Sequence, residues 1–158
     1  MADIEREYMK VAFEVAEEGM ADGLGGPFGA VVVKDGEIIA TGANRVVRDL
    51  DPTAHAEIVA VRAACRALGT HSLEGCELFC TTEPCSMCLS AIYWARLDRV
   101  WYAATREQAA QSGFDDMVIY KEVSLGIDER QLPMIRLETG DSAALFDAWR
   151  RLPSKVPY

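Results

Sequence analysis

The residues of this chain that could do chemistry are two cysteines and a histidine. Cys85 and Cys88 stand three positions apart in "PCSMC", and His55 stands in "HAE". A spacing of three places both sulfurs on one side of a helical turn, and a helix N-terminus favours the thiolate form of cysteine. One histidine and two thiolates make a three-ligand zinc site. A catalytic zinc keeps its fourth position for water.

Other interpretations of these cysteines are a redox pair or a structural clip, but neither explains the nearby histidine and acid. A structural zinc would need a fourth protein ligand. The other histidine, His71, lies in the turn-like "LGTHSLEG", and we interpret it as an ordinary loop residue. The odd number of cysteines argues against a disulfide framework. We interpret the remaining three as small buried hydrophobes: Cys65, Cys76 and Cys80.

Glu57 is the candidate acid of this group. It follows His55 by two residues, which directs it to a different side of the helix start, near a metal-held water. A carboxylate there can take a proton from the water and pass it to a leaving amine. By itself Glu57 would be a solvated helix residue. Beside three zinc ligands it becomes the candidate catalytic residue.

Hydrophobic periodicity predicts the elements that must position these residues. The expected order is helix 3–21, a hairpin within 28–46, helix 54–68, strand 76–81, helix 85–95, strand 98–104, a short helix or irregular segment 106–114, helix 115–123, strand 133–138 and helix 142–152. A hairpin followed by βαβ units predicts an α/β fold, a three-layer α/β/α sandwich with a mixed five-stranded sheet. The helices that begin at the candidate ligands would then start at the carboxyl ends of strands, where ligands collect.

Length, composition and charge restrict the class of protein. With 158 residues, half of them hydrophobic, the chain fits one domain, 1–158, with a real core. The net charge of −9, without a basic cluster, argues against a nucleic-acid partner. No apolar run is long enough for a bilayer, so we expect no membrane contact. The N-terminal "MADIEREYMK" is acidic where a signal peptide would be basic, and we expect a cytoplasmic protein.

The combination of H-x-E with P-C-x-x-C is the signature of zinc nucleobase deaminases, and the chain resembles the cytidine deaminase superfamily. The resemblance becomes closer in "GGPFGAVVVKDG", "DPTAHAE", "AIYWAR", "GFDD", "IYKE" and "AWR" with a C-terminal "PY". These segments are similar to the bacterial guanine deaminases of that superfamily. The resemblance covers nearly the whole chain, and "GFDD" and the terminal tyrosine are more specific than the zinc signature.

This resemblance implies zinc held by His55, Cys85 and Cys88, with Glu57 as the proton shuttle. The residues that it assigns to the substrate are Phe28, Asn44, Ala56, Trp94, Asp116 and Tyr158. In this family an aromatic residue packs on the base, which corresponds to Phe28, and an asparagine hydrogen-bonds the ring of the base, which corresponds to Asn44. A backbone N–H binds a substrate carbonyl, which corresponds to the N–H of Ala56. Trp94 would form a pocket wall. Without the resemblance, we would interpret Asn44 equally well as a turn residue or a substrate contact, and Phe28 and Trp94 as core residues.

Asp116 matches an acid that contacts guanine, and a carboxylate can accept from both the N1–H and the amino group of that base. Spacing alone does not decide whether Asp115 or Asp116 faces the pocket, and either could cap a helix; the resemblance selects Asp116. Tyr158 matches a terminal tyrosine that closes the active site of a partner subunit. We therefore expect a homodimer in which a C-terminal helix and tail, about 141–158, is swapped.

The expected activity is hydrolytic deamination of guanine, a small aminated purine, to xanthine and ammonia. Alternatives within the class are guanosine, a pyrimidine or a triazine as substrate. The tRNA adenosine deaminases share both metal motifs, but the charge of −9 argues against a tRNA partner. A non-catalytic zinc module is the alternative from another class, and the intact Glu57 argues against it.

Overall fold

The computed structural model of the chain describes residues 2–157. Helices alternate with strands along most of the chain, as the periodicity predicts. The elements in order are α1 (Ala2–Ala21), β1 (Gly29–Lys34), β2 (Glu37–Ala43), α2 (Val46–Asp49), α3 (Ala56–Leu68), β3 (Cys76–Thr82), α4 (Ser86–Ala95), β4 (Arg99–Ala104), α5 (Arg106–Gln111), α6 (Met117–Ser124), a 3-10 turn (Ile127–Glu129) and α7 (Ser142–Arg151). Among these residues, no helix is both long and apolar enough to cross a bilayer.

The sheet has the strand order β2-β1-β3-β4. Strand β1 runs antiparallel to both β2 and β3, while β3 and β4 are parallel. Asp35 and Gly36 join β1 to β2 with φ values of 50° and 82°. Two consecutive positive φ values are the backbone of the hairpin turn that an Asp-Gly pair favours.

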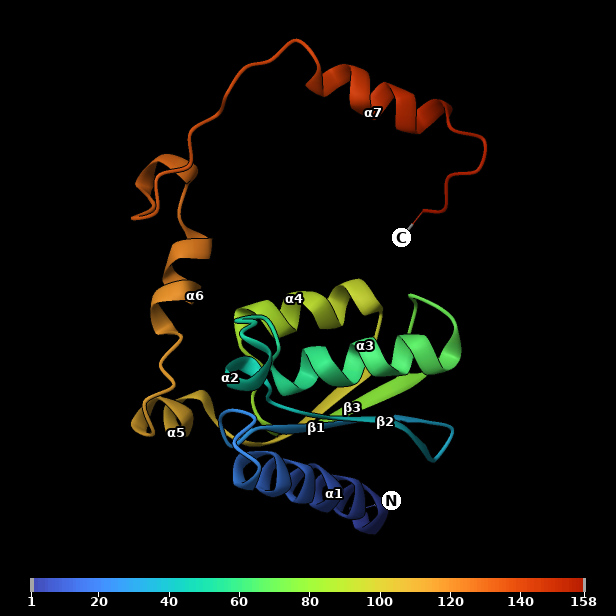
Figure 1. Cartoon of the computed structure of the whole chain (residues 1–158), viewed down its shortest axis with the longest axis vertical. Coiled ribbons are helices and arrows are strands. Elements are labelled where there is room, and N and C mark those ends of the chain that lie inside the picture. The colour runs from blue at the N-terminus through green and yellow to red at the C-terminus, as the bar shows by residue number, and fades with distance from the viewer. Residues whose placement is uncertain (1, 158) are drawn as a thin grey trace. The chain divides into compact units, whose positions relative to one another are not determined.

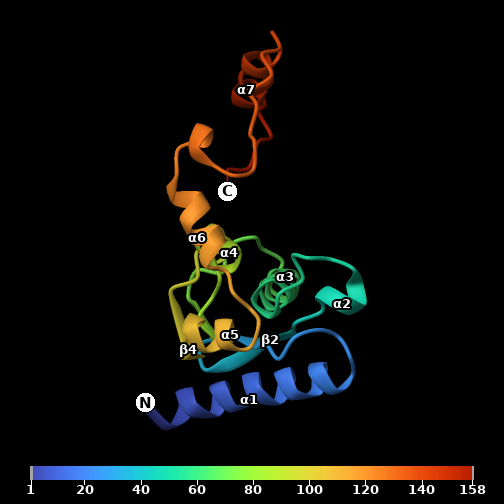
Figure 2. The ribbon, with the colours of Figure 1, turned by 90° about the vertical axis from the view of Figure 1, so that its left-hand side faces the viewer.

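Helices cover both faces of this sheet, with α1 on one face and α3 and α4 on the other (Figure 1; Figure 2). The side chains of β1 alternate accordingly. Ala30 and Val32 pack in the core beneath α3 and α4, whereas Val31 and Val33 pack with Phe79 against α1. The alternation follows from the two-residue period of a strand. The expected three-layer α/β/α arrangement is therefore confirmed.

The expected fifth strand is wrong: the described part of the chain forms a sheet of four strands. Residues 133–138 have the alternation of a strand, but they pair with no other described segment and stay irregular. The alternation of apolar and polar residues indicates which side chains would share a face of a strand. It does not indicate whether another strand lies alongside to accept and donate the backbone hydrogen bonds. The short helix α2 was not expected from the pattern.

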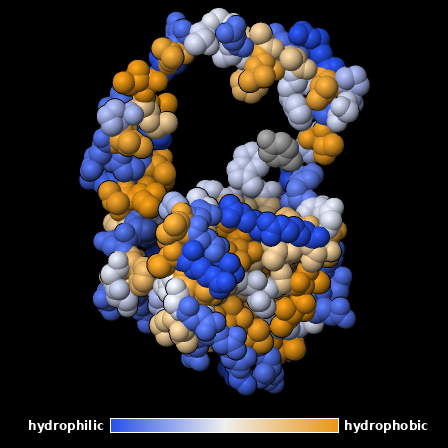
Figure 3. Space-filling view, viewed as in Figure 1, coloured by the Kyte–Doolittle hydropathy of each residue, from blue (hydrophilic) through white to orange (hydrophobic). Residues whose placement is uncertain are grey.

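The chain divides into two compact units, one ending at Met117 and one beginning at Val118. The second unit contains most of α6, the 3-10 turn and α7. None of its described residues, 118–157, is buried, and apolar side chains lie on its surface (Figure 3). Those exposed by more than 60% are Leu132, Ile135, Leu137, Leu145, Phe146 and Val156. From the sequence we expect one domain, 1–158, in which only the C-terminal segment, about 141–158, docks elsewhere.

One edge of the sheet gathers segments that are distant in the sequence. Strands β2, β3 and β4 end at this edge, and β1 begins there because it runs in the opposite direction. The carboxyl ends of these three strands lead to α2 and α3, to α4 and to α5. The N-terminal turns of α3 and α4 therefore come together at this edge, and these are the turns that carry the candidate ligands.

Candidate metal centre and active site

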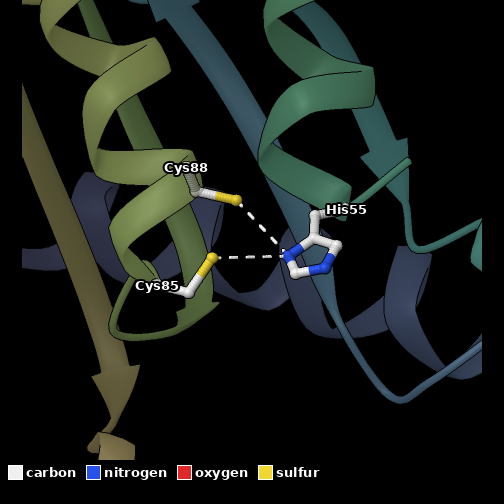
Figure 4. A group of neighbouring side chains, drawn as sticks. All are labelled: His55, Cys85 and Cys88. Carbon is white, nitrogen blue, oxygen red and sulfur yellow. Dashed lines mark hydrogen bonds between the residues drawn. The ribbon is translucent and has the colours of Figure 1, made fainter. Parts of the chain in front are cut away.

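Three side chains converge where α3 and α4 begin. His55 and Cys85 are the residues immediately before these helices, each with extended backbone, and Cys88 lies in the first turn of α4. Neither His55 nor Cys85 uses its side chain to cap its helix. Figure 4 shows both sulfurs directed at the imidazole ring. The two helix starts thus present one nitrogen and two sulfurs to a common point.

The distances in this group fit a zinc ion. The Sγ atoms of Cys85 and Cys88 each lie 3.5 Å from Nδ1 of His55. All three ligand atoms lie within 4.8 Å of one another. Zn–S bonds of about 2.3 Å and Zn–N bonds of about 2.0 Å at a tetrahedral angle separate nitrogen from sulfur by roughly 3.6 Å. Within residues 2–157 this is the only group of three or more histidine, cysteine or acidic residues that could hold a metal, so His71 takes no part in one.

Protonation of the group follows from its hydrogen bonds. The hydrogen bond from Cys88, together with the one from His55, lowers the pKa of the Cys85 thiol to about 4. The hydrogen bond to Cys85, together with burial, raises the pKa of the Cys88 thiol. The hydrogen bond to Cys85 also raises the pKa of His55. Zinc binding would displace the protons of these groups, because a metal binds cysteine as the thiolate.

Glu57 lies beside this group without belonging to it. It is the second residue of α3 and only 8% exposed. Burial raises the pKa of its carboxyl group, since the charged form loses its hydration. A carboxyl group whose pKa is raised holds a proton more readily than one in water. That property is what a general acid–base residue requires.

A cavity of about 380 Å³ opens over His55, Glu57 and Cys85. Its lining comes from five segments at the common edge of the sheet, within residues 26–28, 44–47, 55–57, 82–85 and 106–116. The exposed surface of the lining is mostly apolar. An apolar cavity with a few polar groups and a metal group at its base is the usual form of a small-molecule site.

The sequence model for the zinc-binding region of cytidine and deoxycytidylate deaminases matches residues 2–104. That match contains every residue of the metal group and Glu57. The chain belongs to this deaminase family. Family membership and the donor set together make zinc the metal of the site.

Similar proteins include a guanine deaminase and a tRNA-specific adenosine deaminase. The guanine deaminase of Bacillus subtilis (strain 168) is 49% identical over 151 residues, which cover 96% of this chain and 97% of that protein. Its X-ray structure superposes with a TM-score of 0.94, 48% identity and coverage of 97% and 98% of the two chains. The tRNA-specific adenosine deaminase of Aquifex aeolicus (strain VF5) is 46% identical over 97 residues, 61% of this chain and 64% of that one.

A third similarity is to a protein solved with a small molecule. A mutant of the protein NE0047 in complex with 8-azaguanine has a TM-score of 0.68 and 35% identity, and the match covers 71% of this chain and 64% of that one. The molecule bound in that structure, 8-azaguanine, is an aminated purine analogue.

Asn44 of the deaminase follows β2 and lines the cavity, 6% exposed. Its side-chain oxygen accepts hydrogen bonds from the backbone N–H groups of Gly26 and Val46, each at 3.2 Å. Both lone pairs of the amide oxygen are then occupied, which leaves the NH₂ group as the part of the side chain available to a ligand. Any hydrogen bond between the Asn44 side chain and a ligand would therefore be one that Asn44 donates.

Phe28 and Phe114 form an aromatic wall of the deaminase cavity. Their rings meet edge to face, with centroids 4.8 Å apart and planes at 84°. A flat ring system can pack on such a wall. Phe114 was missed in the sequence, although it stands in "GFDD"; the signal was an apolar residue inside an otherwise polar, loop-like segment.

The two adjacent acids of the deaminase differ in what they contact. Asp115 is exposed, and its Oδ1 accepts a hydrogen bond of 2.9 Å from the backbone N–H of Met117 at the start of α6. Asp116 is half-buried, and the pKa of its carboxyl group is raised by burial and by the Cys85 thiolate. Both line the cavity. Asp115 thus caps the helix, whereas Asp116 lies in the electrostatic field of the metal group.

The structure does not bring Trp94 to the cavity. Within α4, Cys88, Ile92 and Ala95 face the interior, and Trp94 falls on the other side of the helix with 64% exposure. The lining of the cavity in the described chain does not include Trp94, so its role as a pocket wall stays a prediction.

Ala56 is buried, and its N–H lies in the first turn of α3 between His55 and Glu57, where N–H groups have no partner within the helix. The expectation for Tyr158 falls outside the described residues.

Proposed function

We propose that this deaminase converts guanine and water to xanthine and ammonia. The observation that carries the proposal is the meeting, in one apolar cavity, of the metal group and Glu57 with a donor, Asn44, and an acceptor, Asp116. Guanine carries both kinds of partner, a carbonyl acceptor and N–H donors, on a flat ring. The similarity to a guanine deaminase over nearly the full length of both chains supports the same substrate.

Each residue has a separate task in this reaction. His55, Cys85 and Cys88 would hold zinc, which when bound supplies the Lewis acid that activates water. Glu57 takes a proton from the attacking water and delivers it to the ring nitrogen as the C–O bond forms. It then takes the proton of the newly formed hydroxyl group and passes it to the amine as the C–N bond breaks, so that a carbonyl forms and ammonia leaves.

Binding of the base is assigned to the cavity walls. Asp116 accepts hydrogen bonds from the N–H donors of guanine, and the Asn44 amide donates one to the ring. Phe28 packs against the ring, and the Ala56 N–H donates to a substrate carbonyl. The lining excludes water from the ring because most of its exposed surface is apolar.

Zinc analysis combined with ammonia release from a substrate panel tests this function. The panel contains guanine, guanosine, cytosine, cytidine, an amino-triazine and an adenosine-containing tRNA anticodon stem. We expect about one zinc per chain and the highest kcat/KM with guanine. A higher kcat/KM with the tRNA stem would replace the proposal by the activity of the Aquifex aeolicus relative. A zinc-loaded protein that releases no ammonia from any member would identify a binding module.

We also propose that the active enzyme is a homodimer in which the C-terminal segment, about 141–158, docks on the partner. Leu145, Phe146 and Trp149 of α7 are 70%, 64% and 43% exposed in the single chain. Burying one such side chain contributes roughly 1.5–3 kcal/mol, which favours a docked helix. A second copy offers exposed apolar surface on α4 at Leu89 and Tyr93. The role of Tyr158 in closing the partner's site is part of this proposal.

The proposed location is the cytoplasm. All five cysteines are free, and two of them are metal-ligand candidates that must stay reduced. A reducing compartment preserves such thiols. Zinc content and free-thiol titration of protein isolated without added reductant would check whether the thiols survive in the cell.

A further inference from the structure

Glu83 and Arg106 form an ion pair in the wall of the cavity. Oε1 of Glu83 accepts a hydrogen bond of 3.1 Å from Nε of Arg106, and Oε2 accepts one of 3.3 Å from the Arg106 backbone N–H. Both residues line the cavity. Each side chain is 30% exposed, less than either partner in the other ion pairs of residues 2–157. The pair is therefore more shielded from water than an ordinary surface pair.

On one side the pair is attached to the metal group. Glu83 follows β3 and stands two residues before Cys85. Its own N–H donates a 2.8 Å hydrogen bond to the carbonyl oxygen of Ala104 at the end of β4. Its backbone is thus fixed to the sheet. The carboxylate of Glu83 extends from this fixed point across to the neighbouring helix.

On the other side the pair is attached to the segment that carries Asp116. Arg106 is the first residue of α5, a helix of six residues. The chain turns back after α5, and the N–H of Phe114 donates a 3.1 Å hydrogen bond to the carbonyl oxygen of Ala109 within that helix. The position of Asp116, two residues later, therefore depends on where α5 lies.

We propose that the Glu83–Arg106 ion pair is a positioning element, which holds α5, and with it Asp116, at a fixed place relative to the metal group. This inference rests on the proposed assignment of Asp116 to substrate binding. Neither member of the pair is a catalytic residue, since the proton transfers are assigned to Glu57. The pair links the turn that holds the metal to the segment that binds the base.

The test is a double-mutant cycle between Arg106→Gln and Asp116→Asn, measured as kcat/KM for guanine and as the Kd of 8-azaguanine. Arg106→Gln alone should lower kcat/KM and weaken 8-azaguanine binding at least about tenfold, mainly through KM, because small displacements of a binding group are costly. Zinc per chain should stay unchanged. In the Asp116→Asn background, Arg106→Gln should change kcat/KM and the Kd of 8-azaguanine by less than about twofold. The reason is that the group that Arg106 positions has already lost its charge.

Matched variants separate this role from general stability. Arg99→Gln removes the Arg99–Glu77 pair, 3.8 Å apart, at the opposite end of the same two strands and should leave kcat/KM unchanged. Arg106→Lys keeps the charge and the backbone contact, so it should recover part of the loss seen with Arg106→Gln.

Three outcomes would overturn the proposal. The first is an unchanged kcat/KM and Kd in Arg106→Gln. The second is a double variant whose fold loss in kcat/KM equals the product of the losses in the two single variants, because Arg106 would then act independently of Asp116. The third is loss of zinc in Arg106→Gln, which would make the pair a support of the metal turn. If the wild-type protein does not deaminate guanine, the proposed function alone fails, and the 8-azaguanine Kd values still decide the cycle.

Discussion

Gly42 of β2 lies directly against the backbone of Ala56 in the first turn of α3. A Cβ at Gly42 would lie 2.4 Å from the carbonyl oxygen of Ala56 and 2.5 Å from the backbone nitrogen of Ala60. No side chain fits in that space. The start of α3, with His55 and Glu57, can therefore lie this close to β2 only because residue 42 has no side chain.

Gly42→Ala should accordingly disturb the metal group as well as the fold. We expect a loss of about 1–3 kcal/mol in the free energy of unfolding, the usual cost of overpacking a core, and less than full zinc occupancy. Gly29→Ala is the matched control, because its Cβ would meet the carbonyl oxygen of Ala12 in α1, on the other face of the sheet. That variant should lose stability but keep its zinc, as metal analysis and thermal unfolding would show.

Glu57→Gln should retain one zinc per chain and lose nearly all turnover. Glutamine has the size of glutamate but cannot carry the proton between water and the leaving amine. The measurements are metal analysis and ammonia release from guanine. Turnover close to that of the wild-type protein would refute the proton-shuttle role, and loss of zinc would show that Glu57 instead supports the ligands.

Asp116→Asn should lower kcat/KM for guanine by roughly tenfold or more, because a hydrogen bond to a charged group contributes about 1.5–3 kcal/mol. Its melting temperature should change little. Asp115→Asn is the control: asparagine keeps the oxygen that accepts from the Met117 N–H, so both turnover and stability should be preserved. Equal losses of turnover in the two variants would contradict the separate roles of the two acids.

Deletion of the last few residues should leave a folded, zinc-loaded protein with weakened guanine turnover, because the cavity would stay open to water. Mixing this protein with Glu57→Gln, unfolding both and refolding them together tests whether tails cross between subunits. In a mixed dimer with crossed tails, one site has Glu57 and a donated tail, so activity should rise. If each tail covers its own site, no mixed dimer has a complete site, and the mixture stays at the weak activity of the shortened protein.

The sequence predicted the metal group because its chemistry is local. His55, Cys85 and Cys88 stand at helix starts, and helix starts can be recognised from short stretches of sequence. Asp116 could not be distinguished from Asp115 in this way, since the difference is which side chain turns back to cap α6.

The features that the sequence did not predict are those that depend on contacts between distant segments. Glu83 and Arg106 look like ordinary surface charges until β3 and β4 place them side by side. Trp94 lies outside the lining of the cavity, because closeness to the metal motif in the sequence does not determine which face of α4 a side chain occupies. Residues 133–138 have the period of a strand, but a period cannot show whether another strand lies next to it.

The end of β4 at Ala104 coincides with the end of the match to the deaminase family. That match contains the metal group and Glu57. Arg106, Phe114 and Asp116 all follow it, yet they reach the same cavity because β4 ends at the same edge of the sheet. Selectivity for one base over another can therefore diverge in the last third of the chain, while the machinery that removes the amine stays unchanged.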